Sequence, residues 1–300
     1  MPDAINYGPP VISIDVEDWP QSTWDHSLPI TGRAVENTRR LLRVLRDTEV
    51  RATMFVLGKL AECFPQVVKE IQADGHEVAC HGYGHMEVGR QSPDEFFADV
   101  RQTKDLLEQI IGKPVNGYRA PDFSIVKGTL WALDALAEAG FEYDSSIVPA
   151  RLSRYGIAGW PVLPVRVQLG QGASILEAPL ATFHALGRNW PVGGGGYHRL
   201  LPGVVSRYFA RRIMVGAPFV FYCHPYEFDV YELREIPIRV PLTIRFHQGA
   251  GRRWFEQRFR SFVDCFGGQS MRQMLSAQPW PEFDLRSLTP DSRTEPRETG

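Results

Sequence analysis

This sequence of 300 residues has few cysteines, no long apolar segment and no marked excess of positive or negative charge. The four cysteines include no Cys-x-x-Cys pair, so neither a thiolate zinc site nor a redox motif is predicted, and we expect buried free thiols. No run of about 18 uncharged apolar residues occurs, so no membrane-spanning helix is predicted. Any bound metal is therefore expected to rest on nitrogen and oxygen ligands.

The charge balance also excludes some partners. The 33 lysines and arginines nearly cancel the 35 acidic residues, which leaves a net charge of −2, and arginines cluster only in short pairs such as Arg211-Arg212. The sequence therefore predicts no nucleic-acid partner and no attraction of the whole chain to an anionic membrane. Residues 1–6 lack the basic and apolar segments of a secretion signal, which predicts a cytoplasmic location.

The sequence does contain two histidines with metal-ligand spacing. His81 and His85 flank a Gly-Tyr-Gly tripeptide directly after the apolar residues 78–80. Because glycine is a poor helix former, a tight loop at the end of a strand, and not a helix, would bring both imidazoles to one side. Two unrelated surface or core histidines would explain an isolated pair, but titratable residues at other strand ends favour a site.

Three carboxylates follow the first apolar run of the chain. Residues 11–16 are typical of a buried parallel strand, and Asp15, Glu17 and Asp18 lie at its end. Clustered carboxylates cannot face an apolar core without a compensating cation, which a divalent metal would supply. The alternative is an acidic turn that caps the next helix.

Two further strand-like segments end in a charged or titratable residue near a proline. Arg119 lies two residues before Pro121, and His224 lies directly before Pro225. Proline disfavours helical geometry in the residue before it, so each element stops there and leaves its polar group at the strand's end. Either residue alone would more often be structural, but four such strand ends in one chain indicate a shared site.

Strand-like and helix-like segments alternate along the chain. Apolar and β-branched runs predict strands over residues 11–16, 52–57, 77–80, 117–120, 141–144, 174–178 and 218–223. Amphipathic segments predict helices over residues 33–48, 62–74, 93–111, 127–139 and 201–215. This alternation indicates an α/β fold with a parallel sheet, and polar residues at the strand ends favour a (β/α) barrel with its site at that face.

The remaining segments fit a single domain over residues 1–288. Residues 150–200 are rich in proline and glycine and predict a long surface excursion, which is either purely structural or contacts substrate through its aromatic residues. A helical extension is expected at about 250–280, with a helical pair over residues 253–275. The core residues expected for this pair are Trp254, Phe255, Phe259 and Phe262. Residues 289–300 are predicted to form a disordered tail.

Taken in order, these residues resemble the polysaccharide deacetylases, the family 4 carbohydrate esterases that share the NodB homology domain. The resemblance covers residues 10–230 and rests on Asp15, Asp18, His81, His85, Arg119, Pro121, Asp144 and His224. It implies a distorted barrel with fewer than eight strands. The stretches Gly193 to Pro202 and His224 to Glu227 are similar to a bacterial subgroup associated with exopolysaccharide and surface-glycan loci.

The first motif departs from the family pattern. The family usually carries two adjacent aspartates before Gly-Pro, whereas Val16-Glu17 separates Asp15 from Asp18 here. We favour Asp18 as the metal ligand because it occupies the position before the x-Pro step. Glu17 is the alternative, because it lies two residues after Asp15 and would emerge on the same face of the strand.

The resemblance also implies a metal and a substrate site. It predicts one divalent ion held by Asp18, His81 and His85, with zinc favoured over cobalt, nickel and manganese. Such a site would leave a position open for water and the acyl oxygen. The residues expected to bind substrate are Pro121, Tyr83, Trp19 and Tyr197.

Proton transfer is assigned to the other motif residues. Asp15 would act as the general base, held ionised by Arg119, and His224 would protonate the departing amine. Asp144 would orient His224 and stabilise its charge, although a turn or helix-capping aspartate is the alternative for this residue.

The predicted function is metal-dependent hydrolysis of an N-acetyl or other N-acyl group on an amino sugar, in surface-polysaccharide biosynthesis. The partner would be an N-acetylated glycan, a lipid-linked saccharide or a nucleotide sugar. The alternatives are an amidohydrolase or deformylase acting on a small amide, an O-deacetylase, and an inactive sugar-binding module. The complete set of motif residues argues against the last of these.

Overall fold

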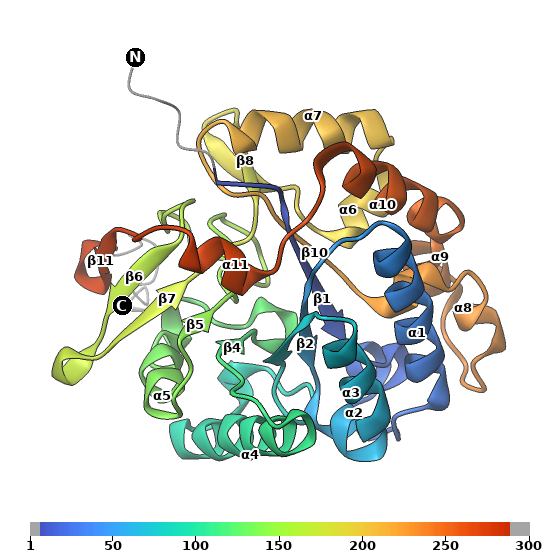
Figure 1. The fold of residues 1–300 in the computed structure, drawn as a ribbon, viewed down its shortest axis with the longest axis horizontal. Coiled ribbons are helices and arrows are strands. Elements are labelled where there is room, and N and C mark those ends of the chain that lie inside the picture. Colours follow the sequence, from blue (N-terminus) through green and yellow to red (C-terminus); the bar gives the residue numbers. More distant parts are fainter. Residues whose placement is uncertain (1–6, 289–300) are drawn as a thin grey trace, which may run out of the picture.

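The computed structural model describes residues 7–288, so the tail predicted over residues 289–300 lies outside the described residues. Its centre is a nine-stranded sheet surrounded by helices (Figure 1). In sheet order the strands are β10 (Val220–Cys223), β1 (Val11–Val16), β2 (Thr53–Val56), β3 (Glu77–Cys80), β4 (Gly117–Tyr118), β5 (Tyr143–Asp144), β7 (Ser174–Glu177), β6 (Val165–Gln168) and β11 (Glu282–Asp284). The first seven of these are all parallel, as expected for a barrel with fewer than eight strands.

Strand β1 is buried along its whole length. All six of its residues are buried, and it pairs with β10 on one side and with β2 on the other. A strand that is covered on both faces needs apolar residues at consecutive positions, which is the pattern of the run Val11-Ile12 and Ile14. Asp15 interrupts this run at the end of the strand, where the site lies.

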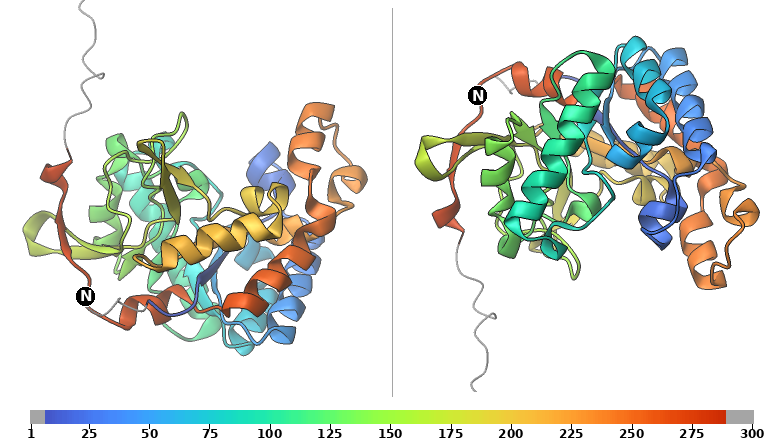
Figure 2. Two further views of the ribbon diagram at one scale, coloured as in Figure 1. Left: turned by 90° about the horizontal axis from the view of Figure 1, so that it is seen from above. Right: turned by 90° about the horizontal axis from the view of Figure 1, so that it is seen from below.

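The helices cover the outside of the sheet (Figures 1 and 2). They are α1 (Gly32–Asp47), α2 (Gly58–Cys63), α3 (Pro65–Ala73), α4 (Pro93–Ile111), α5 (Ala132–Glu138), α6 (Gly195–Leu200), α7 (Gly203–Met214), α8 (Glu232–Glu235), α9 (Leu242–Gly249), α10 (Arg252–Phe266) and α11 (Met271–Ser276). The single helix predicted over residues 62–74 is two helices, because Phe64 leaves helical geometry directly before Pro65. In the described range no helix is long and apolar enough to cross a bilayer.

Residues 150–200 are only in part the surface excursion that their composition predicts. Within them β6 pairs with β7, and β8 (Thr182–Ala185) and β9 (Arg188–Pro191) form a hairpin. The backbone on either side of this hairpin bridges the gap between β5 and β10: the Ala178 N–H donates to the carbonyl of Asp144, and the Tyr222 N–H donates to that of Gly193. This segment thereby fills the part of the barrel wall that lacks a parallel strand.

The C-terminal part packs on the barrel through α10. Phe255, Phe259 and Phe262 recur at helical spacing and are buried, as predicted. The prediction for Trp254 is wrong, because this side chain lies off the buried stripe and is 45% exposed. Among the cysteines, Cys80 and Cys223 at the strand ends are buried free thiols, whereas the other two are exposed.

Candidate active site

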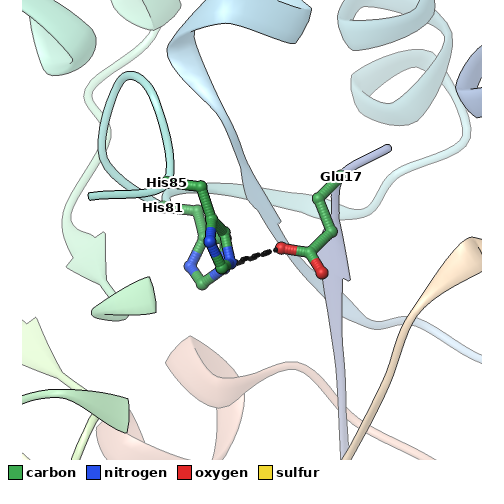
Figure 3. A group of neighbouring side chains, drawn as sticks. All are labelled: Glu17, His81 and His85. Carbon is green, nitrogen blue, oxygen red and sulfur yellow. Dashed lines mark ion pairs between the residues drawn. The ribbon is translucent and has the colours of Figure 1, made fainter. Parts of the chain in front are cut away.

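Two histidines and one carboxylate meet at the carboxyl ends of β1 and β3 (Figure 3). Glu17 directly follows β1, His81 directly follows β3, and His85 lies four residues further on. All three are buried, and their ligand atoms lie within 4.8 Å of one another. Glu17 Oε2 is 2.8 Å from Nε2 of His85 and 3.4 Å from Nε2 of His81. The sequence prediction that a loop makes the two imidazoles converge agrees with this geometry.

The loop that carries the histidines is fixed by its backbone. Gly82 has φ +71°, which favours glycine, and its carbonyl accepts a hydrogen bond from the Gly58 N–H. The Tyr83 N–H donates to Asp99 Oδ1 at 3.0 Å, which ties the loop to α4. His85 itself has φ 62°, a left-handed conformation that costs a non-glycine residue about 1–2 kcal/mol. Such strain is typical of residues whose side-chain direction matters for a site.

The tautomer of His81 follows from one contact. Its Nδ1 lies 2.9 Å from the carbonyl oxygen of Arg119. A carbonyl can only accept, so Nδ1 carries a proton, and Nε2, which faces Glu17, is the ring nitrogen available to a metal. Hydrogen bonding of the second ring nitrogen to a carbonyl is the usual way in which a metal-binding histidine is oriented.

The structure corrects the preference for Asp18 as the third ligand, because the carboxylate beside the histidines is that of the alternative, Glu17. Alternate residues of a strand share a face, so Glu17 follows Asp15 to the same side. Asp18 lies beyond the strand and turns to the start of α1, where it accepts hydrogen bonds from the Thr31 N–H at 2.6 Å and the Thr31 hydroxyl at 3.1 Å. Burial raises the pKa of Asp18 to about 6, against the opposing effect of these bonds.

Asp15 and Arg119 form a buried ion pair next to the triad. Arg119 Nη1 lies 2.8 Å from Asp15 Oδ1 and also donates to the Ser13 hydroxyl. The other guanidinium nitrogens of Arg119 donate to the carbonyl and the hydroxyl of Ser145, and the guanidinium lies 4.2 Å above the ring of Phe55. Arg119 is thus fully buried and fully engaged, so it fixes the orientation of Asp15.

His224 approaches the same carboxylates from the end of β10. Its Nε2 lies 3.5 Å from Glu17 Oε1 and 4.0 Å from Asp15 Oδ2. Its side chain is 20% exposed, so the site is open to solvent on this side. The ring stacks on Tyr226 with 4.6 Å between centroids. The site therefore holds a third imidazole, which faces the oxygen of Glu17 that His81 and His85 do not contact.

The partner of His224 is Glu227. Its Oε2 lies 3.5 Å from His224 Nδ1 and accepts a hydrogen bond from the His224 N–H at 3.1 Å. Its Oε1 lies 3.3 Å from Nε of Arg199. Burial raises the pKa of Glu227, but the charges of His224 and Arg199 outweigh burial and hold it below the ordinary value.

The structure corrects the role predicted for Asp144. None of the contacts of His224 within residues 7–288 involves Asp144. Asp144 is fully buried at the end of β5, where it accepts from the Ser146 hydroxyl at 2.5 Å and shares a hydrogen bond with Glu177. Burial raises the pKa of both carboxyls, and the charge of Asp144 raises that of Glu177 further.

Electrostatics around the triad favour negative charge on Glu17 and positive charge on His224. Burial raises the pKa of Glu17, but His85 and His224 beside it outweigh burial and hold the pKa well below the ordinary value. Burial likewise lowers the pKa of His224, but Glu17, Glu227 and Asp15 outweigh it and raise the pKa to about 9. A cluster of carboxylates that keeps nearby imidazoles charged is a cluster that attracts cations.

The four residues predicted to bind substrate lie in different environments. Trp19 is fully buried in an apolar cluster with Tyr226, so the prediction that it contacts substrate is wrong. Pro121 is buried beside the histidine loop. The Tyr83 hydroxyl donates to Glu62 at 2.6 Å and so points to α2. Tyr197, on α6, is 40% exposed and is the one of the four with an open ring.

Sequence reasoning missed the residues that surround the entrance. The ring of His26 lies 5.5 Å from that of His85, and Arg154 pairs with Asp122 at 2.8 Å. These residues line a cavity of about 120 Å³ beside the histidines. The residues lining it are Ser22, Thr23, His26, Glu87, Arg90, Asp122 and Arg154. None of them lies at a strand end, so the pattern that located the other site residues gave no signal for them.

Comparison with known proteins identifies the family. Residues 8–143 match the model of the polysaccharide deacetylases, and residues 145–276 match a domain of unknown function, DUF3473. This match identifies residues 8–143 as a polysaccharide deacetylase region. This confirms the resemblance inferred from the motifs.

Two curated relatives of this chain are bacterial proteins. A peptidoglycan-N-acetylglucosamine deacetylase of Bacillus cereus is 33% identical over 104 residues, which are 34% of this chain and 38% of that protein. A peptidoglycan deacetylase of Helicobacter pylori is 35% identical over 115 residues, 36% of each chain. The chain thus spans little more than a third of the length of these relatives.

One solved structure shares the fold of nearly the whole chain. A Mycobacterium smegmatis protein described as a polysaccharide deacetylase superposes with a TM-score of 0.55 and 20% identity, over 94% of this chain and 88% of that one. The fold is therefore shared across both matched regions. Both also contribute to the site, because residues 8–143 contain the triad and the Asp15–Arg119 pair, whereas residues 145–276 contain His224 and Glu227.

Proposed function

We propose that this protein is a metal-dependent N-deacetylase that removes the acetyl group of an amino sugar in a glycan or glycan precursor of surface-polysaccharide biosynthesis. The observation that carries the proposal is the convergence of a metal-ligand triad, a buried carboxylate and an imidazole at one end of the sheet. The relatives named for peptidoglycan deacetylation support an N-acetylated amino sugar as the substrate class.

The triad fits a divalent metal. Glu17 Oε2 faces Nε2 of His85 at 2.8 Å, but the two atoms lack the alignment of a hydrogen bond, and Glu17 Oε2 is buried without a hydrogen-bond partner. Two imidazole nitrogens and one carboxylate oxygen are a common ligand set for a catalytic zinc ion. When bound, the metal would polarise the acyl oxygen and acidify a water molecule.

Asp15 is the residue placed to accept the proton of an attacking water. Its Oδ1 is held by Arg119, which leaves Oδ2 free to face the centre of the site, 4.0 Å from His224 Nε2. The contact with Arg119 fixes the direction in which Asp15 presents Oδ2, and a general base must be positioned in this way.

His224 is the residue placed to protonate the amine that leaves. It lies on the open side of the site, and Glu227 on its far nitrogen can fix the ring and stabilise the imidazolium. An amine leaves poorly without a proton, so hydrolysis of an amide requires an acid as well as a base. Asp15 and His224 supply the two roles from opposite regions of the chain.

The proposal is tested by incubating the protein, with and without added zinc, with chitooligosaccharides and with peptidoglycan fragments. Mass spectrometry should show acetyl loss that depends on the metal and disappears in the Asp15→Asn variant. Release of acetate from O-acetylated sugars alone would replace the proposal with an O-deacetylase. No acetyl loss from any N-acetylated sugar by the fully metal-loaded protein would refute it.

A further inference from the structure

The region that joins β10 to α10 has a charge composition that the net charge of the whole chain conceals. Residues 236–255 contain four arginines and one histidine but no acidic residue. The segment forms α9 and the start of α10, and in both views of Figure 2 the orange ribbon of α8 and α9 projects from the body of the molecule. A local excess of arginine on a projecting segment predicts contact with an anion.

A cavity of about 460 Å³ lies between α8, α9 and the start of α10. Four of the residues that line it are arginines, and no acidic residue lines it. The four are Arg234, Arg245, Arg252 and Arg253. Like charges converge on a cavity at an energetic cost, so their arrangement indicates a compensating anion.

The acidic residues near this cavity are all paired, and only Glu232 pairs with an arginine that lines it. Asp229 and Glu235 both pair with Arg33, and Glu232 pairs with Arg252 at 2.7 Å. In the described part of the chain Arg234, Arg245 and Arg253 have no ion pair. Three guanidinium groups are therefore available to a ligand.

Arg252 provides a buried and incompletely used donor. It is only 3% exposed, and its Nη1 donates to Glu232 and to the carbonyls of Tyr226 and Asp229. Its Nη2, however, is buried without a hydrogen-bond partner, as is Nε of Arg245. Buried polar atoms are almost always satisfied, so unpartnered guanidinium nitrogens in two residues that line one cavity are evidence for an absent ligand.

The start of α10 adds backbone donors to the same place. This helix of 15 residues begins at Arg252, directly after Gly251 with φ +80°. No side chain caps it, its first turn contains no acidic residue, and Gly251 to Arg253 line the cavity. Free N–H groups and the positive end of the helix dipole favour an anion at this position.

We propose that this cavity is a binding site for a phosphate group. A doubly charged tetrahedral oxyanion can accept from several guanidinium groups and from backbone N–H groups at once, whereas one carboxylate would leave most of these donors unpaired. Phe246 lines the cavity and is 79% exposed, and Leu242 on the same helix is 81% exposed. An apolar surface beside a phosphate site suits either the acyl chains of a lipid phosphate or the base of a nucleotide.

The test measures binding and does not depend on deacetylation. Inorganic pyrophosphate is titrated into full-length, metal-free protein by calorimetry, after the chelator is removed, so that metal at the triad cannot recruit the phosphate. The double variant Arg245→Ala/Arg253→Ala should bind at least about 10-fold more weakly, because it loses two charge-assisted contacts. The control is Arg239→Ala, which removes an exposed arginine of the same segment that does not line the cavity.

Two further arms identify the source of the phosphate. A nucleotide sugar that binds more tightly than pyrophosphate would indicate a soluble ligand, whereas sedimentation with phosphatidylglycerol vesicles, but not with phosphatidylcholine vesicles, would indicate a lipid headgroup. Each interaction should be lost in the double variant and retained in Arg239→Ala. The proposal is overturned if wild-type protein binds none of the three probes, or if a folded double variant binds them as tightly as wild type.

Discussion

The Nδ1 atom of His224 lies 3.5 Å from Oε2 of Glu227, three residues further along the chain. The carboxylate is held in turn by Arg199, whose Nε lies 3.3 Å from Oε1. On its other ring nitrogen His224 faces Glu17 and Asp15. The ring is therefore fixed between two sets of carboxylates, one for orientation and one that belongs to the reacting centre.

The Glu227→Gln variant should lower kcat by about 10- to 100-fold while the metal stays bound, because it removes the charge that stabilises the imidazolium but keeps the shape of the side chain. The loss should be larger on an N-acetyl sugar than on its O-acetyl counterpart, since an ester needs less acid assistance. The matched control is Asp144→Asn, which should change kcat less because Asp144 does not contact His224. Equal losses on both substrates would exclude a role for Glu227 through the general acid.

Metal analysis of Glu17→Gln and Asp18→Asn should separate the two neighbouring carboxylates. The first variant should lose most of its zinc, because Glu17 lies with His81 and His85, whereas the second should retain it. Asp18→Asn should instead lower the thermal stability, since Asp18 anchors the start of α1 through Thr31. If Asp18→Asn loses the metal and Glu17→Gln keeps it, the ligand assignment made here is wrong.

Two adjacent glycines of α6 should respond in opposite ways to alanine. A Cβ at Gly195 would overlap Oε2 of Glu227 and approach the Cβ of Cys223 at 2.8 Å, whereas a Cβ at Gly196 would meet only Arg199 Nη2 at 3.9 Å. We expect Gly195→Ala to cost about 1–3 kcal/mol of stability and to lower kcat by displacing Glu227. Gly196→Ala should be neutral or stabilise the helix by up to about 1 kcal/mol. Chemical denaturation and steady-state kinetics of the pair measure both effects.

Asp99 should contribute more to the free energy of unfolding at acidic pH than at neutral pH. Burial raises the pKa of this carboxyl to about 6, above its ordinary value of 3.8. The folded state therefore binds this proton more tightly than the unfolded state, and the resulting stability falls as pH rises from about 4 to 6, by at most about 3 kcal/mol. Asp99→Asn keeps an acceptor for the Tyr83 N–H and should stabilise the protein at pH 7 but not at pH 4. Melting temperatures at both pH values decide this, and a gain that is equal at pH 4 would contradict the assignment.

The sequence was sufficient to predict those parts of the fold in which local pattern and tertiary environment agree. Strand β1 lies at the predicted residues 11–16, and α4 spans the predicted residues 93–111, with the side chain of Ser92 capping its start. The short strands β6, β8 and β9 have no comparable pattern. Strand β6 depends on its pairing with β7, and β8 and β9 belong to residues 178–193, which fill the barrel wall between β5 and β10; both are tertiary requirements.

Some site residues could likewise be predicted from the sequence, whereas others could not. His81, His85, Arg119 and His224 follow from their places at strand ends, where parallel strands deliver side chains to one edge of the sheet. The choice between Glu17 and Asp18 depends on where the chain turns after β1. Strand alternation favours Glu17, which lies on the same face as Asp15, and the turn takes Asp18 away to Thr31. Glu227 lies three residues after His224, so its contact with the ring is local, whereas its ion pair with Arg199 depends on the packing of α6.

The pairing of β1 with β10 determines when this protein can become complete during its synthesis. Ser13, on the first strand, donates its hydroxyl to the carbonyl of Phe221, 208 residues later. A ribosome needs on the order of 10–40 s to add that length, and during this time one edge of β1 has no native partner. The strand that finally covers this edge also brings His224 to the site, so no shorter nascent chain carries the complete catalytic set.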